Sequence, residues 1–427
     1  MFNYFYCAFV WLVLVAYPNI SGAGVVPDQL ELGVCTHLAQ QKHSSDSYFR
    51  IFNEIGATSF RDEYYWSRVE KRAGELSNPP VLNEVVKAIH RAPADAIKPL
   101  VVLSYGNFVY DAGGLPVAEE YQLAFSRYAS FVANNFKGKA RYYEVWNEWN
   151  IGKGSSPKAN YGDPADYARL LKKTYSAIKA VDGDAIVLGG SVTNWDSKWI
   201  SGFISAGGAQ YADGVAVHPY NYYSPKRAPE DVIYWLDSLH HLLDKNALKI
   251  PIYVTEIGWP SYIGLNGVTP SVAADYVVRF ISLAATRKFI KGVWWYDLVN
   301  DGGNLFVHED NFGLYKPDLE EKPQAIAFRK ISSLLSESSW VRLIKPTKTA
   351  YIVEFSSPRK KSWLLWSQVG SGESIAIKTN KDALPTKFVA GEDSSIGVVF
   401  GGQRKNIVIG VSPVLISGDQ NFVLSTD

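Results

Sequence analysis

The chain has 427 residues, of which 47% are hydrophobic and 20% charged, so its composition is that of a folded globular protein and not of a disordered one. Its 43 basic and 42 acidic residues leave a net charge of +1, which favours neither nucleic acid nor an anionic membrane as the main partner. The aromatic content, 13 Trp, 26 Tyr and 20 Phe, serves either a large core or contacts with the apolar faces of sugar rings.

The N-terminus carries an apolar run from Phe5 to Ala16 that is short for a membrane span and is followed by small residues. We therefore predict a signal peptide over residues 1–23 and a secreted or periplasmic protein, with no membrane span in the mature chain. An uncleaved anchor is the alternative, because no basic residue precedes the run. Cleavage would remove Cys7 and leave Cys35 alone, so we expect no internal disulfide.

Between residues 24 and 338, short apolar strands alternate with segments whose apolar residues recur at helical spacing. Eight strand–helix units in this length predict a (β/α)₈ TIM barrel. A doubly wound sheet is the rival fold, but no Gly-x-Gly-x-x-Gly follows the first strand and the chain has no P-loop. The predicted strands are Leu30–Leu38, Thr58–Trp66, Lys98–Asn107, Ala140–Asn150, Ala185–Thr193, Asp213–Tyr220, Ile252–Ser261 and Lys291–Leu298.

From residue 339 to residue 427 the helical period is absent, and short strands are separated by Gly, Pro, Ser and Asp. This sequence pattern predicts a small C-terminal all-β module, sandwich-like in form. Its role is either a structural appendage of the barrel or an independent sugar-binding module. The predicted strands are Tyr351–Phe355, Ser362–Trp366, Ser374–Ile377, Gly397–Phe400 and Asn406–Ile409.

Catalytic groups of such barrels lie at the C-terminal ends of the strands, where this chain places two glutamates. Glu148 ends the fourth predicted strand and Glu256 the seventh. No His, Cys and Asp group has metal-ligand spacing, Cys35 has no evident partner, and no Gly-x-Ser-x-Gly elbow occurs, so we expect no metal and no cofactor. The other strand ends offer His37, Arg61 with Asp62, Ser104 with Tyr105 and Asn107, Asn147, His218 with Tyr220, and Trp294 or Trp295.

Two carboxyl groups at facing strand ends suit cleavage of a glycosidic bond, which needs one neutral and one ionised group. Arg61 and Tyr220 are placed to keep Glu256 ionised, and the apolar and aromatic neighbours of Glu148 favour its neutral form. His37 and His218 either bind sugar hydroxyls or are satisfied residues of the barrel mouth.

The sequence Trp146-Asn147-Glu148 on the fourth strand, with Thr255-Glu256 on the seventh, resembles the clan A retaining glycoside hydrolases. Within the clan the plan is most like family 39, particularly bacterial members that act on exopolysaccharide. Families 5 and 17 also stay open. The resemblance implies the following roles: Glu148 as acid/base, Glu256 as nucleophile, Asn147 on the sugar 2-hydroxyl, Arg61 and Tyr220 in support of the nucleophile, and Trp295 beneath the reacting sugar.

We therefore expect a monomeric retaining glycosidase that acts on a polysaccharide or oligosaccharide by double displacement, without a cofactor. Two alternatives use the same residues. One is a carbohydrate-binding protein on a barrel scaffold, and the other is a transglycosylase that remodels polysaccharide. The sugar, its linkage and the choice between internal and terminal cleavage depend on loops that the sequence does not define.

Overall fold

The computed structural model describes residues 30–40, 43–93, 96–157, 159, 161–225, 227–388 and 402–426. The signal peptide predicted over residues 1–23 and the strand predicted at Gly397–Phe400 lie outside these ranges. Among the helices within them, none combines the length and the apolar character that a membrane span requires.

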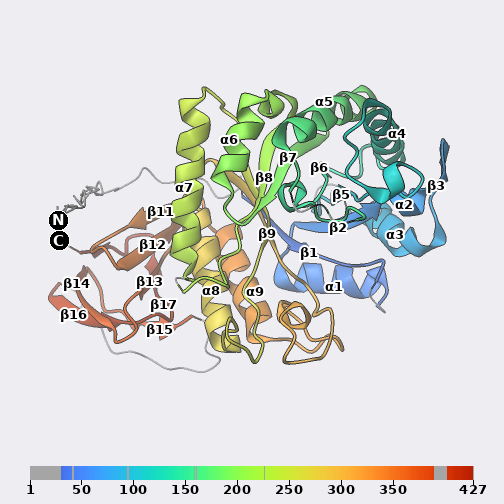
Figure 1. The fold of residues 1–427 in the computed structure, drawn as a ribbon. Coiled ribbons are helices and arrows are strands. Elements are labelled where there is room, and N and C mark those ends of the chain that lie inside the picture. Colours follow the sequence, from blue (N-terminus) through green and yellow to red (C-terminus); the bar gives the residue numbers. More distant parts are fainter. Residues whose placement is uncertain are drawn as a thin grey trace, which may run out of the picture.

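Eight parallel strands close into a barrel at the centre of the molecule, as predicted (Figure 1). Around the barrel the order is β1-β10-β9-β8-β7-β6-β5-β2. Each barrel strand thus pairs with the barrel strand before it in the sequence, and the last, β10, pairs with the first, β1. The strands are β1 (Glu31–Cys35), β2 (Ser59–Tyr65), β5 (Leu100–Ser104), β6 (Tyr142–Val145), β7 (Ile186–Thr193), β8 (Gly214–His218), β9 (Ile252–Ile257) and β10 (Ile290–Trp295).

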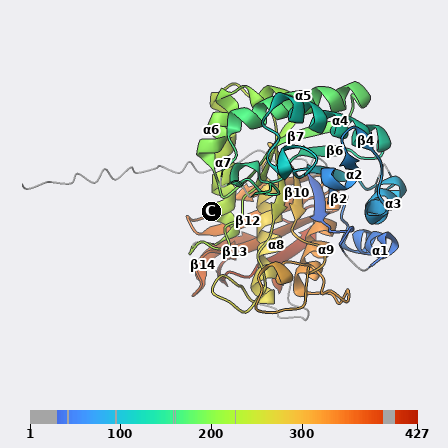
Figure 2. The same cartoon turned by 45° about the vertical axis from the view of Figure 1, so that its right-hand side comes forward.

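Helices follow the barrel strands and form the outer layer (Figures 1 and 2). Helix α5 begins as the sequence predicts, since Asp163 caps it by accepting hydrogen bonds from the N–H groups of Ala165 and Asp166, and Pro164 occupies its first turn. A short hairpin of β3 (Glu70–Arg72) and β4 (Glu75–Leu76) projects after β2. The helices are α1 (Ser45–Ile55), α2 (Trp66–Val69), α3 (Asn83–Arg91), α4 (Glu119–Asn135), α5 (Pro164–Val181), α6 (Ser197–Ser205), α7 (Pro229–Lys245), α8 (Pro270–Ala284) and α9 (Pro323–Ser336).

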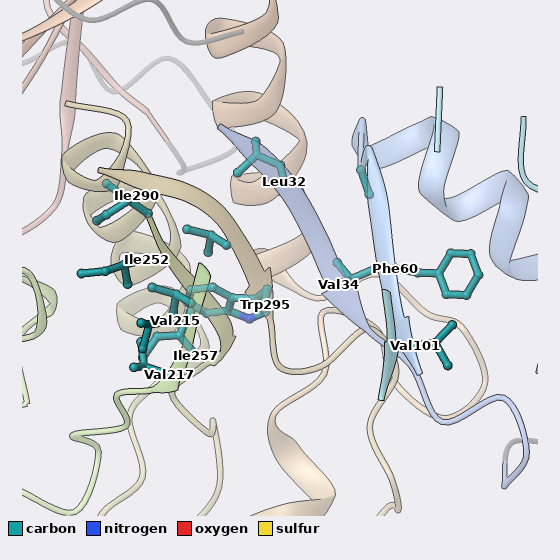
Figure 3. Close-up of a cluster of buried hydrophobic side chains, with 14 of the residues drawn as sticks. Leu32, Val34, Phe60, Val101, Val215, Val217, Ile252, Ile257, Ile290 and Trp295 are labelled. Atoms are coloured by element: carbon teal, nitrogen blue, oxygen red, sulfur yellow. The ribbon is translucent and has the colours of Figure 1, made fainter. Parts of the chain in front are cut away.

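Alternate side chains of each barrel strand face the barrel interior and the helices. Figure 3 shows the helix-facing set, which includes Leu32, Val34, Phe60 and Val215. The interior is filled by a separate buried cluster, and Gly33 leaves the room that its largest member, Trp294, requires, because a Cβ at Gly33 would lie 2.1 Å from the indole. The interior cluster contains Cys35, Leu100, Val102, Tyr142, Leu188, Ala216, Tyr253 and Trp294.

Two antiparallel sheets form the C-terminal module, which confirms the predicted all-β architecture. One sheet has the order β11-β12-β13-β17-β15 and the other the order β16-β14-β18. Strands β11, β15, β17 and β18 were not predicted. Strand β11 carries an arginine in a run of five residues, β17 contains a glycine and an aspartate, and β15 and β18 have two residues each. The strands are β11 (Trp340–Ile344), β12 (Ala350–Ser356), β13 (Lys360–Ser367), β14 (Glu373–Thr379), β15 (Thr386–Lys387), β16 (Arg404–Ile409), β17 (Val414–Asp419) and β18 (Leu424–Ser425).

The five-stranded sheet is buried on both faces. Ile352 and Leu365 pack toward the second sheet, whereas Tyr351, Val353 and Trp366 belong to the core of the barrel domain. The module lies beside α7 and α8 in Figure 1, and Trp366 donates its indole N–H to Glu230 at the start of α7 over 2.7 Å. These contacts favour a structural role for the module.

A buried ion pair lies at this junction. Arg279 of α8 contacts Glu230 with both Nε and Nη2, at 2.9 and 2.5 Å, and the two side chains are 3% and 1% exposed. Removal of the arginine would leave an unpaired carboxylate in the interior, which is far more costly than the loss of an exposed pair.

We therefore predict that Arg279→Met lowers the free energy of unfolding by about 3–5 kcal/mol in urea titrations. The double variant Glu230→Gln/Arg279→Met should recover much of this loss, because it removes the stranded charge. Lys316→Ala is the control, since Lys316 and Glu320 are 48% and 60% exposed and such pairs contribute at most about 1 kcal/mol. Equal losses for Arg279→Met and Lys316→Ala would contradict the assignment.

Candidate active site

A pocket of about 460 Å³ opens at the C-terminal ends of the barrel strands. All eight strands or the segments directly after them contribute to its lining, which is rich in carboxylates and tyrosines. A larger recess of about 1040 Å³ lies at the opposite end of the barrel, around Glu31, Lys98 and Tyr142, remote from the predicted site. The lining of the smaller pocket includes His37, Arg61, Glu63, Tyr65, Tyr105, Asn147, Glu148, Lys153, Asn194, Tyr220, Tyr222, Glu256, Tyr296, Asp301, Glu309 and Phe312.

The two glutamates singled out in the sequence meet in this pocket. Glu256 belongs to β9, and Glu148 follows β6 with a left-handed backbone conformation, φ 52° and ψ 48°. A carboxylate oxygen of each glutamate and a ring nitrogen of His218 all lie within 4.8 Å of one another. Both side chains are largely buried, at 12% exposure for Glu148 and 9% for Glu256.

Arg61, on β2, contacts residues of both β6 and β9. Its Nη1 lies 2.8 Å from Glu256 Oε1, its Nε donates to Glu144 over 2.7 Å, and its Nη2 donates to the side-chain oxygen of Asn147 over 2.8 Å. Tyr220 donates its hydroxyl to the other oxygen of Glu256 over 2.8 Å. Glu256 therefore accepts from a cation and a phenol, which together fix the orientation of its carboxylate.

His218 lies beneath the two glutamates and is fully buried. Its Nδ1 is 3.3 Å from Glu148 Oε1, and its Nε2 is 3.2 Å from Glu144 and 3.0 Å from the hydroxyl of Thr255. Of the two readings of this histidine, the structure supports the satisfied residue of the barrel mouth, because the ring does not line the pocket.

The buried ionisable groups at this site shift one another's pKa values. Burial raises the pKa of Glu144, but the charge of Arg61 and the hydrogen bond from His218 lower it to about 2. Burial lowers the pKa of His218, but Glu256, Glu144 and Glu148 raise it to about 9. Burial also raises the pKa of Glu148, whereas the hydrogen bond and charge of His218 bring it below its ordinary value. The predicted apolar surroundings of Glu148 are thus corrected, since a cation contacts it.

Glu144 was missed in the sequence analysis although it is the most connected carboxylate here. Besides Arg61 and His218, it accepts hydrogen bonds from Ser191 and Thr255, over 2.7 and 2.9 Å. A signal for it exists, because strand alternation places residue 144 on the same inward face as Tyr142, where a carboxylate is unexpected.

The placement predicted for Trp295 is also corrected. Trp295 faces the helices, where its ring lies 5.8 Å from that of Trp259, and Figure 3 shows it among the outward-facing aliphatic side chains. Trp294 faces inward but fills the barrel interior below the pocket. The next inward position is Tyr296, which lines the pocket in their place.

His37 lines the pocket and pairs with Asp301, 2.7 Å away. Burial lowers its pKa, but the hydrogen bond and charge of Asp301 raise it to about 10. In the part of the chain that the structure describes, two groups have the spacing to hold a metal, Glu148–His218–Glu256 and His37–Asp297–Asp301. Each contains an imidazole that is already hydrogen-bonded to a carboxylate.

No protein-family model and no curated protein sequence matches this chain. Solved structures do match it. A family 39 glycoside hydrolase from the gut symbiont Bacteroides cellulosilyticus WH2 has a TM-score of 0.77 at 23% identity, over 92% of this chain and 82% of that one. A monomeric β-xylosidase from Caulobacter crescentus CB15 has a TM-score of 0.62 at 14% identity, over 92% and 97%. A glucosidase from Croceicoccus marinus has a TM-score of 0.63 at 12% identity, over 92% and 96%. These likenesses establish the shared fold.

Glu144 should control the protonation of His218. We predict that Glu144→Gln lowers the pKa of His218 from about 9 toward the ordinary histidine value, because one of the carboxylates that stabilise the imidazolium is removed. Histidine-selective NMR titration measures this shift. Ser191→Ala, which removes a donor to Glu144 but keeps its charge, should move the pKa much less. An unchanged His218 pKa in Glu144→Gln would contradict the network.

Proposed function

We propose that the protein is a retaining glycoside hydrolase of clan A, most similar to family 39, that acts on a polysaccharide or oligosaccharide. The observation that carries the proposal is the pair of carboxyl groups, Glu148 and Glu256, with oxygens within 4.8 Å in one pocket. Retaining glycosidases hold their two carboxyl groups about 5–5.5 Å apart, whereas inverting enzymes leave about 6.5–9.5 Å for a water molecule. The likeness to a family 39 enzyme supports the family assignment.

Glu256 is proposed as the nucleophile. One of its carboxylate oxygens attacks the anomeric carbon as the bond to the leaving oxygen breaks, and a covalent glycosyl ester forms. Arg61 and Tyr220 hold the carboxylate in a fixed orientation through contacts of 2.8 Å each. Water then cleaves the ester, and the sugar leaves with its original anomeric configuration.

Glu148 is proposed as the acid that protonates the leaving oxygen and as the base that activates water in the second step. Its hydrogen bond with His218 has a consequence for this role. Because the imidazolium lowers the pKa of Glu148, the protonated acid is present mainly under acidic conditions. We therefore propose that hydrolysis is fastest at acidic pH.

Carbohydrate as the substrate class is supported by the ring of tyrosines around the pocket, whose faces suit stacking on sugar rings. Asn147 is held by Arg61 and donates to Tyr105 over 2.9 Å, so its amide is fixed at the pocket wall beside Glu148. We propose that this amide contacts the sugar 2-hydroxyl, as the resemblance to the clan A enzymes implies.

Substitution of each glutamate tests the assignment. Glu256→Gln should abolish hydrolysis across a panel of polysaccharides and aryl glycosides, because the amide does not form the ester, while binding of oligosaccharides is kept. Glu148→Gln should lower kcat by about 10²–10⁴-fold, the usual contribution of general acid catalysis. Glu75→Gln, on the exposed β3–β4 hairpin, is the control and should leave the rate unchanged. Hydrolysis that persists in Glu256→Gln would refute the nucleophile, and elongated products with an added acceptor would indicate transglycosylation.

The pH profile tests the link between His218 and Glu148. In His218→Gln the imidazolium is absent, so the pKa of Glu148 rises and Glu148 stays protonated to higher pH. The alkaline limb of the kcat/KM profile should therefore move to higher pH. His37→Gln removes another cation of the pocket, one that pairs with Asp301, and should leave that limb in place. A limb that stays fixed or moves to lower pH in His218→Gln would contradict the proposed link.

A further inference from the structure

Glu63 differs from every other carboxylate that lines the pocket. The remaining four each have a basic side chain close by, at 3.3 Å for Glu148, 2.8 Å for Glu256, 2.7 Å for Asp301 and 3.0 Å for Glu309. Within the described ranges, no Lys, Arg or His nitrogen lies within 4 Å of the Glu63 carboxylate. Among the carboxylates that line the pocket, Glu63 is therefore the one without a basic side chain within 4 Å in the described part of the chain.

The contacts of Glu63 come from neutral phenols. Tyr65 donates its hydroxyl to Oε2 over 2.5 Å, and Tyr105 donates its hydroxyl to Oε1. A carboxylate has about four acceptor positions, so two phenols leave part of its capacity open toward the pocket. What the site lacks is an opposite charge, because both of these donors are neutral.

The position of Glu63 places it next to the reacting centre. It follows Arg61 by two residues on β2, so the two side chains share the inward face and Glu63 lies about 7 Å further along the strand, toward the mouth. Asn147, beside Glu148, donates to the Tyr105 oxygen, and Tyr105 in turn donates to Glu63. A sugar held at Glu256 and Asn147 is therefore within reach of this carboxylate.

His37 is close enough for Glu63 to be one of the carboxylates that raise its pKa, but no nitrogen of its ring lies within 4 Å of the Glu63 carboxylate. His37 is bound to Asp301 over 2.7 Å, and the two form a pair of opposite charges. Lys153, another cation of the lining, follows Glu148 on the β6 side of the pocket. Arg61, which shares the inward face of β2 with Glu63, is paired with Glu144 and Glu256.

We propose that Glu63 is a subsite for the ammonium group of an unacetylated amino sugar, and that the substrate of this glycosidase carries such a sugar. This inference rests on the proposed function. The free amine supplies both the hydrogen-bond donors and the charge that Glu63 lacks, a neutral hydroxyl supplies donors alone, and a uronic acid is repelled. N-acetylation removes the charge and enlarges the group, so acetylated sugars are disfavoured.

The test measures binding, so it does not depend on turnover. Calorimetric titration of the full chain compares D-glucose with its 2-, 3- and 6-amino derivatives, with N-acetyl-D-glucosamine and with D-glucuronate, below the pKa of the amines. At least one amino derivative should bind tenfold or more tightly than glucose, and the acetylated and acidic forms more weakly than that derivative. This preference should disappear in Glu63→Gln and be retained in Glu63→Asp, which keeps the charge.

Glu309→Gln is the matched control, because it removes a carboxylate of the same lining that already has His308 beside it, and the amine preference should survive. Circular dichroism verifies that the Glu63 variants fold. Equal binding of amino and neutral sugars by the wild type, or a preference that persists in Glu63→Gln, would overturn the subsite. A preference that depends on Glu63, in a protein that hydrolyses no glycoside, would support the subsite and refute the proposed function.

Discussion

The buried contact of Glu144 with Arg61 and His218 is the constraint on which the site depends. Two cations in the barrel interior carry a large desolvation cost, and Glu144, itself fully buried, compensates both. Arg61 then reaches Glu256, and His218 reaches Glu148. Glu144 thus helps to fix the positions of Glu256, through Arg61, and of Glu148, through His218. Four donors hold Glu144, so its orientation is fully determined before any substrate enters.

The barrel supplies the geometry for this arrangement. Each strand alternates between the helix layer and the interior, and the interior residues nearest the C-terminal ends become the pocket. Large interior residues such as Trp294 need glycine neighbours, and they close the barrel below the polar layer. The C-terminal module is joined to the barrel at Glu230, at the start of α7, where Trp366 of β13 and Arg279 of α8 both contact this carboxylate.

The architecture and the two central glutamates were predictable, because counting apolar strands in the sequence places Glu148 on the fourth and Glu256 on the seventh. Side-chain direction was harder to predict. Trp294 and Trp295 are adjacent and equally aromatic, and only the phase of the strand, fixed by packing with β1 and β9, decides that Tyr296 reaches the pocket. Glu144 and Glu63 were overlooked for a related reason: each lies inside a strand, and their importance comes from partners far away in the chain. Strands β11 and β17 have mixed sequences that become strands through pairing with β12 and β13.

The stereochemistry of hydrolysis tests the central claim most directly. Once a substrate is identified with the polysaccharide panel, NMR spectra recorded in the first minutes report the anomeric configuration of the sugar as it is released, before mutarotation. The proximity of Glu148 and Glu256 predicts retention, through a glycosyl ester on Glu256. A product released with inverted configuration would contradict the account, because water would then attack the sugar directly and Glu256 would not be a nucleophile.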